Sequence, residues 1–148
     1  ALERAVEGLK CQTAVHICYG YGIKANTDWK QTLGNEWRQY EESFPLLQKS
    51  NIDIISLECQ NSKVPMDLIE LVRGKKVMLG AIDVATNEIE TPEQVADILR
   101  KALQFVDAEN LYPCTNCGMA PLSRAVARGK LNALAQGASI LRNELASK

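Results

Sequence analysis

The stretch Thr13-Ala-Val-His-Ile-Cys18 is an apolar run that leads into the glycine-rich turn Tyr19-Gly-Tyr-Gly22. Short apolar runs that end at turn residues are typical of buried strands. Three similar runs follow, at residues 52–57, 76–83 and 111–115, and helical patterns separate them. Strands that alternate with helices predict an α/β fold with a parallel sheet, and we expect helices to cover both faces of that sheet.

The segments between these runs have helical signals of different quality. Thr91-Pro92-Glu93-Gln94 has the pattern of a capping box with proline at the first helical position, so a helix is expected to begin there. Residues 27–49 have apolar side chains at approximately helical spacing, and Gly34 and Pro45 predict a break or kink. Further helices are expected at residues 1–8, 65–72 and 121–145, the last with Gly129 and Gly137 as weak points.

Composition limits the possible functions. The 148 residues are 46% hydrophobic and carry a net charge of −1, so nothing in the charge favours nucleic acid or an anionic membrane surface. No apolar run approaches the roughly 20 residues that cross a bilayer. The five cysteines are an odd number in a chain long enough to build a core, which favours free thiols in a reducing cytoplasm over a disulfide framework.

Side chains that bind borderline metals lie where several of the predicted strands end. His16 and Cys18 are two residues apart, so they face the same side of one strand. Glu58 ends the second apolar run, and Cys117 follows the fourth. Because the carboxyl ends of parallel strands meet at one edge, nitrogen, sulfur and carboxylate ligands gathered there predict a zinc site.

Other interpretations of these residues stay open. A single histidine near a strand end can be structural, Glu58 can be a solvated carboxylate, and Cys11 and Cys59 fit small buried apolar residues. Cys114 and Cys117 form a C-x-x-C pair, which is also a redox motif. Asp83, at the end of the third run, can bind substrate or cap a turn. Ser123 and Arg124 can contact an anion or simply begin a helix.

Four motifs in this order resemble a known family. They are His16-Ile-Cys18-Tyr19, Ile55-Ser-Leu-Glu58, Gly80-Ala-Ile-Asp83 and Asn116-Cys117-Gly118-Met119, and the chain is similar to the C-terminal half of the catalytic barrel of cobalamin-independent methionine synthase. The resemblance implies four βα units with parallel strands, half of a TIM (β/α)8 barrel. It also implies zinc bound by His16, Cys18, Glu58 and Cys117, and a catalytic part for Asp83.

The activity that the resemblance implies is transfer of a methyl group to the thiol of homocysteine, which gives methionine. The family has a histidine two residues after the third-strand aspartate, where this chain has Ala85, and Asp-Cys-Gly where this chain has Asn116. The implied methyl donor is therefore open: methyl-folate, a corrinoid protein or another donor. The segment between Cys18 and Glu58 is also longer than in the usual enzyme. Glu58 is the ligand we expect an incoming thiolate to displace.

The same resemblance implies a missing partner. The chain begins without methionine and within a helical pattern, so we expect residues 1–148 to be a piece of a longer protein, whose N-terminal half completes the barrel. Two alternatives remain at this point. One is a related zinc thiol-alkyltransferase such as a methylcobalamin:coenzyme M methyltransferase, and the other is a non-catalytic or redox α/β module.

Overall fold

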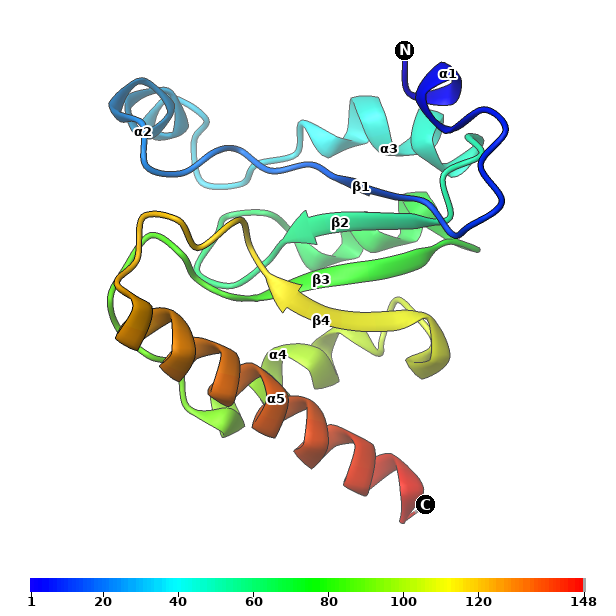
Figure 1. The fold of residues 1–148 in the computed structure, drawn as a ribbon. Coiled ribbons are helices and arrows are strands. Elements are labelled where there is room, and N and C mark those ends of the chain that lie inside the picture. The colour runs from blue at the N-terminus through cyan, green and yellow to red at the C-terminus, as the bar shows by residue number, and fades with distance from the viewer. Residues whose placement is uncertain (148) are drawn as a thin grey trace.

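The computed structural model describes residues 1–147, which form one four-stranded sheet and the helices that follow its strands (Figure 1). The sheet order is β1-β2-β3-β4, and every neighbouring pair is parallel. The strands are β1 (Ala14–His16), β2 (Ile54–Glu58), β3 (Lys76–Ile82) and β4 (Leu111–Thr115). The predicted α/β fold with four parallel strands is therefore confirmed.

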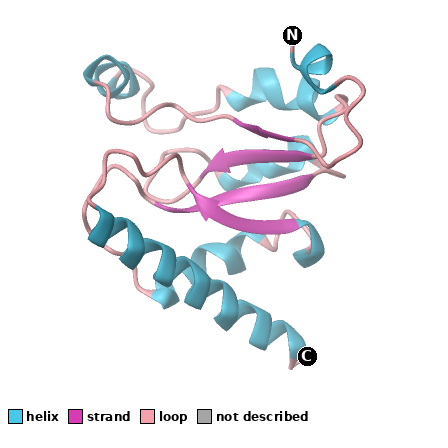
Figure 2. Cartoon of the chain, in the orientation of Figure 1, coloured by secondary structure: helices cyan, strands magenta, loops and turns pink. Residues whose placement is uncertain are grey.

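Helical segments precede, connect and follow the strands, as Figure 2 shows. They are α1 (Leu2–Val6), α2 (Lys24–Gln31), α3 (Tyr40–Gln48), the 3₁₀ helices η1 (Met66–Val72) and η2 (Ala108–Asn110), α4 (Pro92–Ala102) and α5 (Arg124–Ala146). The predicted capping box is present, because the Thr91 side chain accepts from the Gln94 backbone N–H and the Gln94 side chain accepts from the Thr91 backbone N–H. Pro92 occupies the first turn of α4, as the sequence predicts.

The structure bears on three details of the predicted helices. The break predicted at Gly34 is confirmed, since α2 ends at Gln31 and α3 starts only at Tyr40. Pro45 does not break α3, where buried Phe44 and Leu47 anchor the helix on the core. Gly137 is not a weak point of α5: a Cβ atom there would lie 2.5 Å from the Cβ of Val95, so its small size lets α5 pack closely on α4.

Helices cover only one face of the sheet, which corrects the expectation of cover on both faces. Val77, Leu79 and Ala81 of β3 belong to the core that the sheet shares with the helices, and each is at most 1% exposed. The alternate residues of the strands line the other face, which is partly open. Tyr112 of β4 is 39% exposed there, and Ala14 and His16 of β1 are also exposed. One open face suits a segment of a barrel, whose helices lie only outside.

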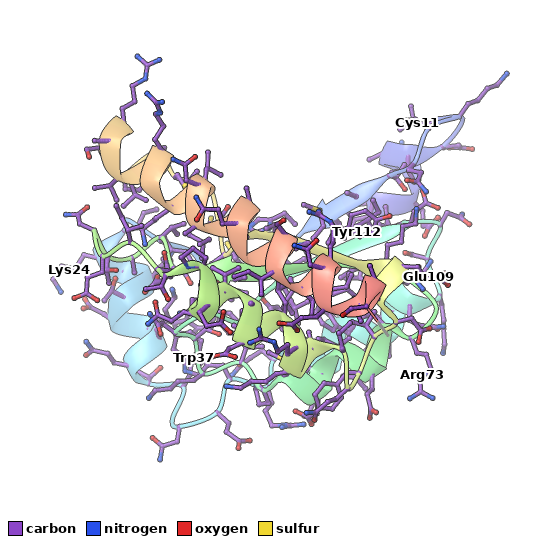
Figure 3. All side chains as sticks on the ribbon, turned by 90° about the horizontal axis from the view of Figure 1, so that it is seen from below. Cys11, Lys24, Trp37, Arg73, Glu109 and Tyr112 are labelled. Carbon is purple, nitrogen blue, oxygen red and sulfur yellow. The ribbon has the colours of Figure 1, made fainter. Side chains whose placement is uncertain are left out.

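All four strands end at the same side of the molecule. In Figure 1 their loops gather near α2, opposite α1 and the N-terminus. Figure 3 views the chain from below, with Lys24 and Trp37 towards one end of the molecule and Arg73 and Glu109 towards the other, and with α5 beside α4. No helix within residues 1–147 is long and apolar enough to cross a membrane.

A buried ion pair fixes the loop that follows β3. Lys130 of α5 is 0% exposed, and its Nζ lies 3.0 Å from Oε2 of Glu90. Glu90 in turn accepts a hydrogen bond at Oε1 from the backbone N–H of Asp83, at 2.8 Å. Helix α5 therefore holds the strand end that carries Asp83.

We expect Lys130→Ala to lower the free energy of unfolding by about 3–5 kcal/mol, because it leaves the Glu90 carboxylate buried without its cation. Urea denaturation measures this change. The exposed Lys101→Ala on α4 is the matched control and should stay within about 0.5 kcal/mol of the parent protein. Equal stability of the two variants would show that the buried pair does not hold the loop.

Candidate metal centre

Three of the four predicted ligands meet at the carboxyl edge of the sheet. The ligand atoms of His16, Cys18 and Cys117 all lie within 4.8 Å of one another. The two sulfur atoms are 3.5 Å apart. Two thiolates on one zinc ion at Zn–S distances of about 2.3 Å would lie about 3.8 Å apart, so the sulfur spacing is close to that of a bound ion.

This meeting depends on the path of the loops after β1 and β4. Cys18 follows β1 and Cys117 follows β4, and these are the first and last strands of the sheet. With neighbouring strands about 4.8 Å apart, a flat sheet would separate β1 from β4 by about 14 Å. The sulfur contact therefore requires the two loops that follow β1 and β4 to turn towards each other.

A second strand orients the histidine. Nδ1 of His16 lies 2.8 Å from Oγ of Ser56, which is directly opposite it in the β1–β2 register. Ser56 is buried, so its hydroxyl offers a fixed partner. Contact at Nδ1 leaves Nε2 as the ring nitrogen available to a metal, and a hydrogen bond at the other nitrogen is the usual support of a ligating histidine.

Glu58 lies outside the group of three. It is the last residue of β2 and is 0% exposed. Its Oε1 accepts a hydrogen bond from the Tyr19 backbone N–H at 2.6 Å, and its Oε2 accepts one from the Tyr21 hydroxyl. Burial, together with the hydrogen bond to Glu58, raises the pKa of Tyr21 far above its ordinary value, so this hydroxyl keeps its proton.

Asn116 connects this carboxylate to the ends of the strands. Its side chain is 0% exposed and donates from Nδ2 to the Gln60 carbonyl at 2.7 Å and to the Tyr21 hydroxyl oxygen at 3.2 Å. Its Oδ1 accepts from the backbone N–H groups of Cys59 and Gln60, each at 3.3 Å. An aspartate at this position could not donate either of the first two bonds without a proton.

Asp83 has the turn-capping contacts that the sequence left as one alternative. Its Oδ1 accepts from the Ala85 backbone N–H at 2.8 Å, and its Oδ2 accepts from Nδ2 of Asn61 at 3.2 Å. It also borders a cavity of about 450 Å³ that Tyr21, Lys30 and Trp37 help to line. A part in catalysis stays a prediction for Asp83.

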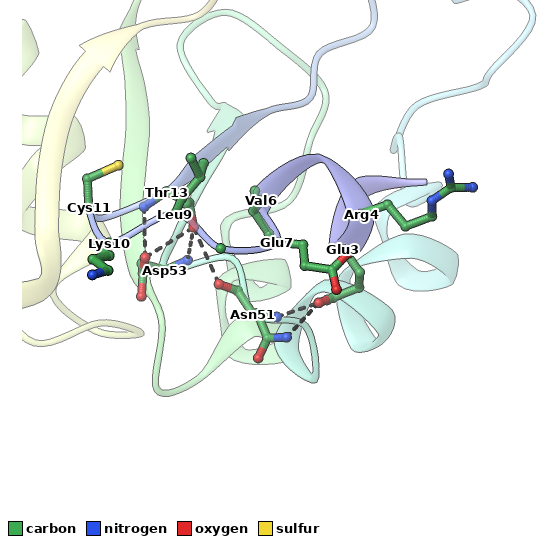
Figure 4. A pocket seen from close by; sticks show the side chains of 11 residues that line it. Glu3, Arg4, Val6, Glu7, Leu9, Lys10, Cys11, Thr13, Asn51 and Asp53 are labelled. Atoms are coloured by element: carbon green, nitrogen blue, oxygen red, sulfur yellow. Dashed lines mark hydrogen bonds between the residues drawn. The ribbon is translucent and has the colours of Figure 1, made fainter.

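A different cavity, of about 670 Å³, lies away from these residues, between α1 and the chain entering β1 and β2 (Figure 4). Asn51 donates two hydrogen bonds to Glu3 there, and the Thr13 backbone N–H donates to Asp53. These side chains pair with each other at the amino ends of the strands. The chemistry of the carboxyl edge is therefore separate from this cavity.

Sequence reasoning missed three residues of the site. Ser56, Tyr21 and Asn116 are not residue types that usually bind zinc, so the pattern of metal-ligating residues does not include them. Signals for two of them existed, because Tyr21 stands between two glycines and Asn116 directly precedes Cys117. Their hydrogen bonds join different strands and loops, so they depend on the strand register, which the sequence does not show.

Comparison with known proteins assigns the chain to a protein family. The family model described as "Cobalamin-independent synthase, Catalytic domain" matches residues 2–139. The match covers most of the chain, so the protein belongs to this family, and the resemblance noted from its motifs is confirmed.

Individual relatives are consistent with this assignment. The chain is 31% identical to the methionine synthase of Saccharolobus islandicus (strain Y.G.57.14 / Yellowstone #1), over 100% of this chain and 40% of the relative. It is 28% identical to the methionine synthase of Sulfurisphaera tokodaii, over 100% of this chain and 38% of the relative. The chain thus spans about two fifths of the length of these relatives.

A solved structure is more similar still. The B12-independent methionine synthase from Shewanella sp. W3-18-1, solved in complex with selenomethionine, is 78% identical to the chain with a TM-score of 0.95. The similarity covers 99% of this chain and 43% of that one. The four βα units therefore have the fold of a part of that enzyme's barrel.

The structure also bears on the C-x-x-C alternative. All five cysteines are free, and Cys117 faces Cys18. Burial raises the pKa of the Cys114 thiol to about 11, although a hydrogen bond with Ser56 acts in the opposite direction. Redox cysteines of C-x-x-C motifs have lowered pKa values, so the raised pKa of Cys114 counts against a redox role for this pair.

We expect iodoacetamide at about pH 7.5 to modify the exposed Cys11 before Cys114 in the reduced protein, since only thiolates react. Raising the pH should speed modification of Cys114 about tenfold per unit, because its thiolate fraction grows until the pH reaches the pKa of about 11. Peptide mass spectrometry follows both sites. Faster reaction of Cys114 than of Cys11 at neutral pH would instead identify a low-pKa redox thiol.

Proposed function

We propose that the protein contributes to methyl transfer onto the thiol of homocysteine, with zinc held by His16, Cys18 and Cys117. The observation that carries this proposal is the convergence of one imidazole and two thiols within 4.8 Å at the carboxyl edge of a parallel sheet. One nitrogen and two sulfur ligands favour zinc over magnesium or calcium, which prefer oxygen. Family membership supports the reaction.

The metal and the residues have separate tasks in this proposal. Zinc, when bound, supplies a Lewis acid that favours thiolate over thiol near neutral pH. Ser56 orients the His16 ring. Glu58 would be the exchangeable fourth ligand, whose place on bound zinc the substrate thiolate would take. The substrate sulfur then forms a bond with the methyl carbon, and the electron pair of the broken bond leaves with the donor.

We further propose that residues 1–148 are the C-terminal half of the catalytic barrel and act in the cytoplasm. The open sheet face with Tyr112 and Met78 supports the proposal that another part of the barrel covers it. The chain also matches only 43% of its solved relative. That relative binds selenomethionine, the selenium counterpart of the proposed product. The methyl donor, whether methyl-folate, a corrinoid protein or another, is left to experiment, because Ala85 stands where the family has a histidine.

We expect the reduced, natural full-length protein to bind about one zinc per chain. Cys117→Ser should lose the metal, because one of its two thiolates is gone, whereas the neighbouring Cys114→Ser should keep it. Elemental analysis measures both. Zinc retained by Cys117→Ser, or lost from Cys114→Ser, would contradict the proposed ligand set.

The same preparations test the reaction. With homocysteine as acceptor, we expect methionine from the parent protein and from Cys114→Ser, and none from Cys117→Ser. Methyl-folate and methylcobalamin are the two donors to offer. Methylation of coenzyme M in place of homocysteine would assign the protein to the related thiol-alkyltransferases instead.

A further inference from the structure

The Glu58 carboxylate is occupied on both oxygens by one loop, residues 19–21. Tyr19 donates its backbone N–H to Oε1, and Tyr21 donates its hydroxyl to Oε2. The carboxylate is fully buried but lies outside the group formed by His16, Cys18 and Cys117. Glu58 is thus held near the candidate metal centre, with its charge satisfied by other partners.

Tyr21 is itself fixed in place. The Asn116 amide donates to the Tyr21 oxygen at 3.2 Å, so the proton of Tyr21 is directed to Glu58. The ammonium of Lys30 lies 3.9 Å from the centre of the Tyr21 ring. Gly20 and Gly22, with φ of 82° and 77°, flank Tyr21 in a backbone conformation that other residues rarely adopt. These contacts hold the Tyr21 hydroxyl against the Glu58 carboxylate.

We propose that Tyr21 is a positioning residue that takes up the Glu58 carboxylate when the substrate thiolate displaces it from the metal. This inference rests on the proposed zinc site. The geometry that supports this inference is the contact of Oε2 of Glu58 with the Tyr21 hydroxyl, close to the three candidate ligands. The metal and the Tyr21 hydroxyl then compete for one carboxylate.

This competition predicts that loss of the Tyr21 hydroxyl changes the affinities for zinc and for homocysteine in opposite directions. A hydrogen bond to a charged group contributes enough free energy to change an equilibrium roughly tenfold when it is lost. Tyr21→Phe removes the hydroxyl and keeps the ring. Zinc should then bind about tenfold more tightly, because Glu58 stays on the metal, and homocysteine should bind about tenfold more weakly, because Glu58 is harder to displace.

The experiment uses the natural full-length protein and four variants: Tyr21→Phe, Tyr19→Phe, Glu58→Gln, and the double variant Tyr21→Phe with Glu58→Gln. Chelator competition gives the zinc affinity, and the thiolate-to-metal absorption of the cobalt-substituted protein reports homocysteine binding. Tyr19→Phe is the matched control. Its hydroxyl donates to Gln39 at 2.8 Å, and its backbone bond to Glu58 is unaffected.

The expected result is tighter zinc and weaker homocysteine in Tyr21→Phe, neither change in Tyr19→Phe, and no effect of Tyr21→Phe once Glu58 is glutamine. Loss of fold cannot imitate this result, since it would weaken both ligands. Unchanged or weaker zinc binding in Tyr21→Phe overturns the inference and leaves the proposed function standing. Absence of zinc binding in the parent protein overturns the proposed function, and the inference with it.

Discussion

Parallel pairing of four strands is the constraint on which the candidate site depends. Because β1 to β4 all run in the same direction, every strand delivers its last residues to one edge. The loops after β1 and β4 then turn towards each other, so that sulfur atoms from residues 18 and 117 lie 3.5 Å apart. Neither constraint alone would gather ligands that are so far apart in the chain.

Two sets of polar contacts stabilise the strand ends at this edge. Ser56 holds the His16 ring from the neighbouring strand, and Asn116 joins the end of β4 to the loop after β2. Farther out, the buried pair of Lys130 and Glu90 ties helix α5 to the backbone of Asp83. Buried polar groups of this kind are costly unless paired, and these are paired across elements, which fixes the edge.

The sequence alone was enough for the parallel α/β fold and for the ends of its later elements. The capping box at Thr91 and the run at residues 111–115 gave local signals that tertiary packing did not override. Gly34 indicated the break between α2 and α3. The continuation of α3 through Pro45 was not predictable, because it depends on the burial of Phe44 and Leu47 in the core. The open face of the sheet was not predictable, because the strands are nearly all apolar and show little alternation of apolar and polar residues.

The proximity of three candidate ligands was predictable from the sequence, and the contacts that support them were not. His16, Cys18 and Cys117 carry the chemistry in their own side chains, and their positions at strand ends brought them together in the structure. Glu58 shares the same position on its strand, but its carboxylate turns to Tyr19 and Tyr21, which lie in a loop whose path depends on Gly20 and Gly22. No periodic pattern in the sequence predicts the path of this loop.

X-ray absorption at the zinc edge of the loaded, substrate-free protein tests the central claim most directly, because it counts the atoms bound to the metal. The account predicts two sulfur atoms and one imidazole nitrogen from this chain, with a single oxygen completing four ligands. A first shell with no sulfur, or with one sulfur only, would contradict it.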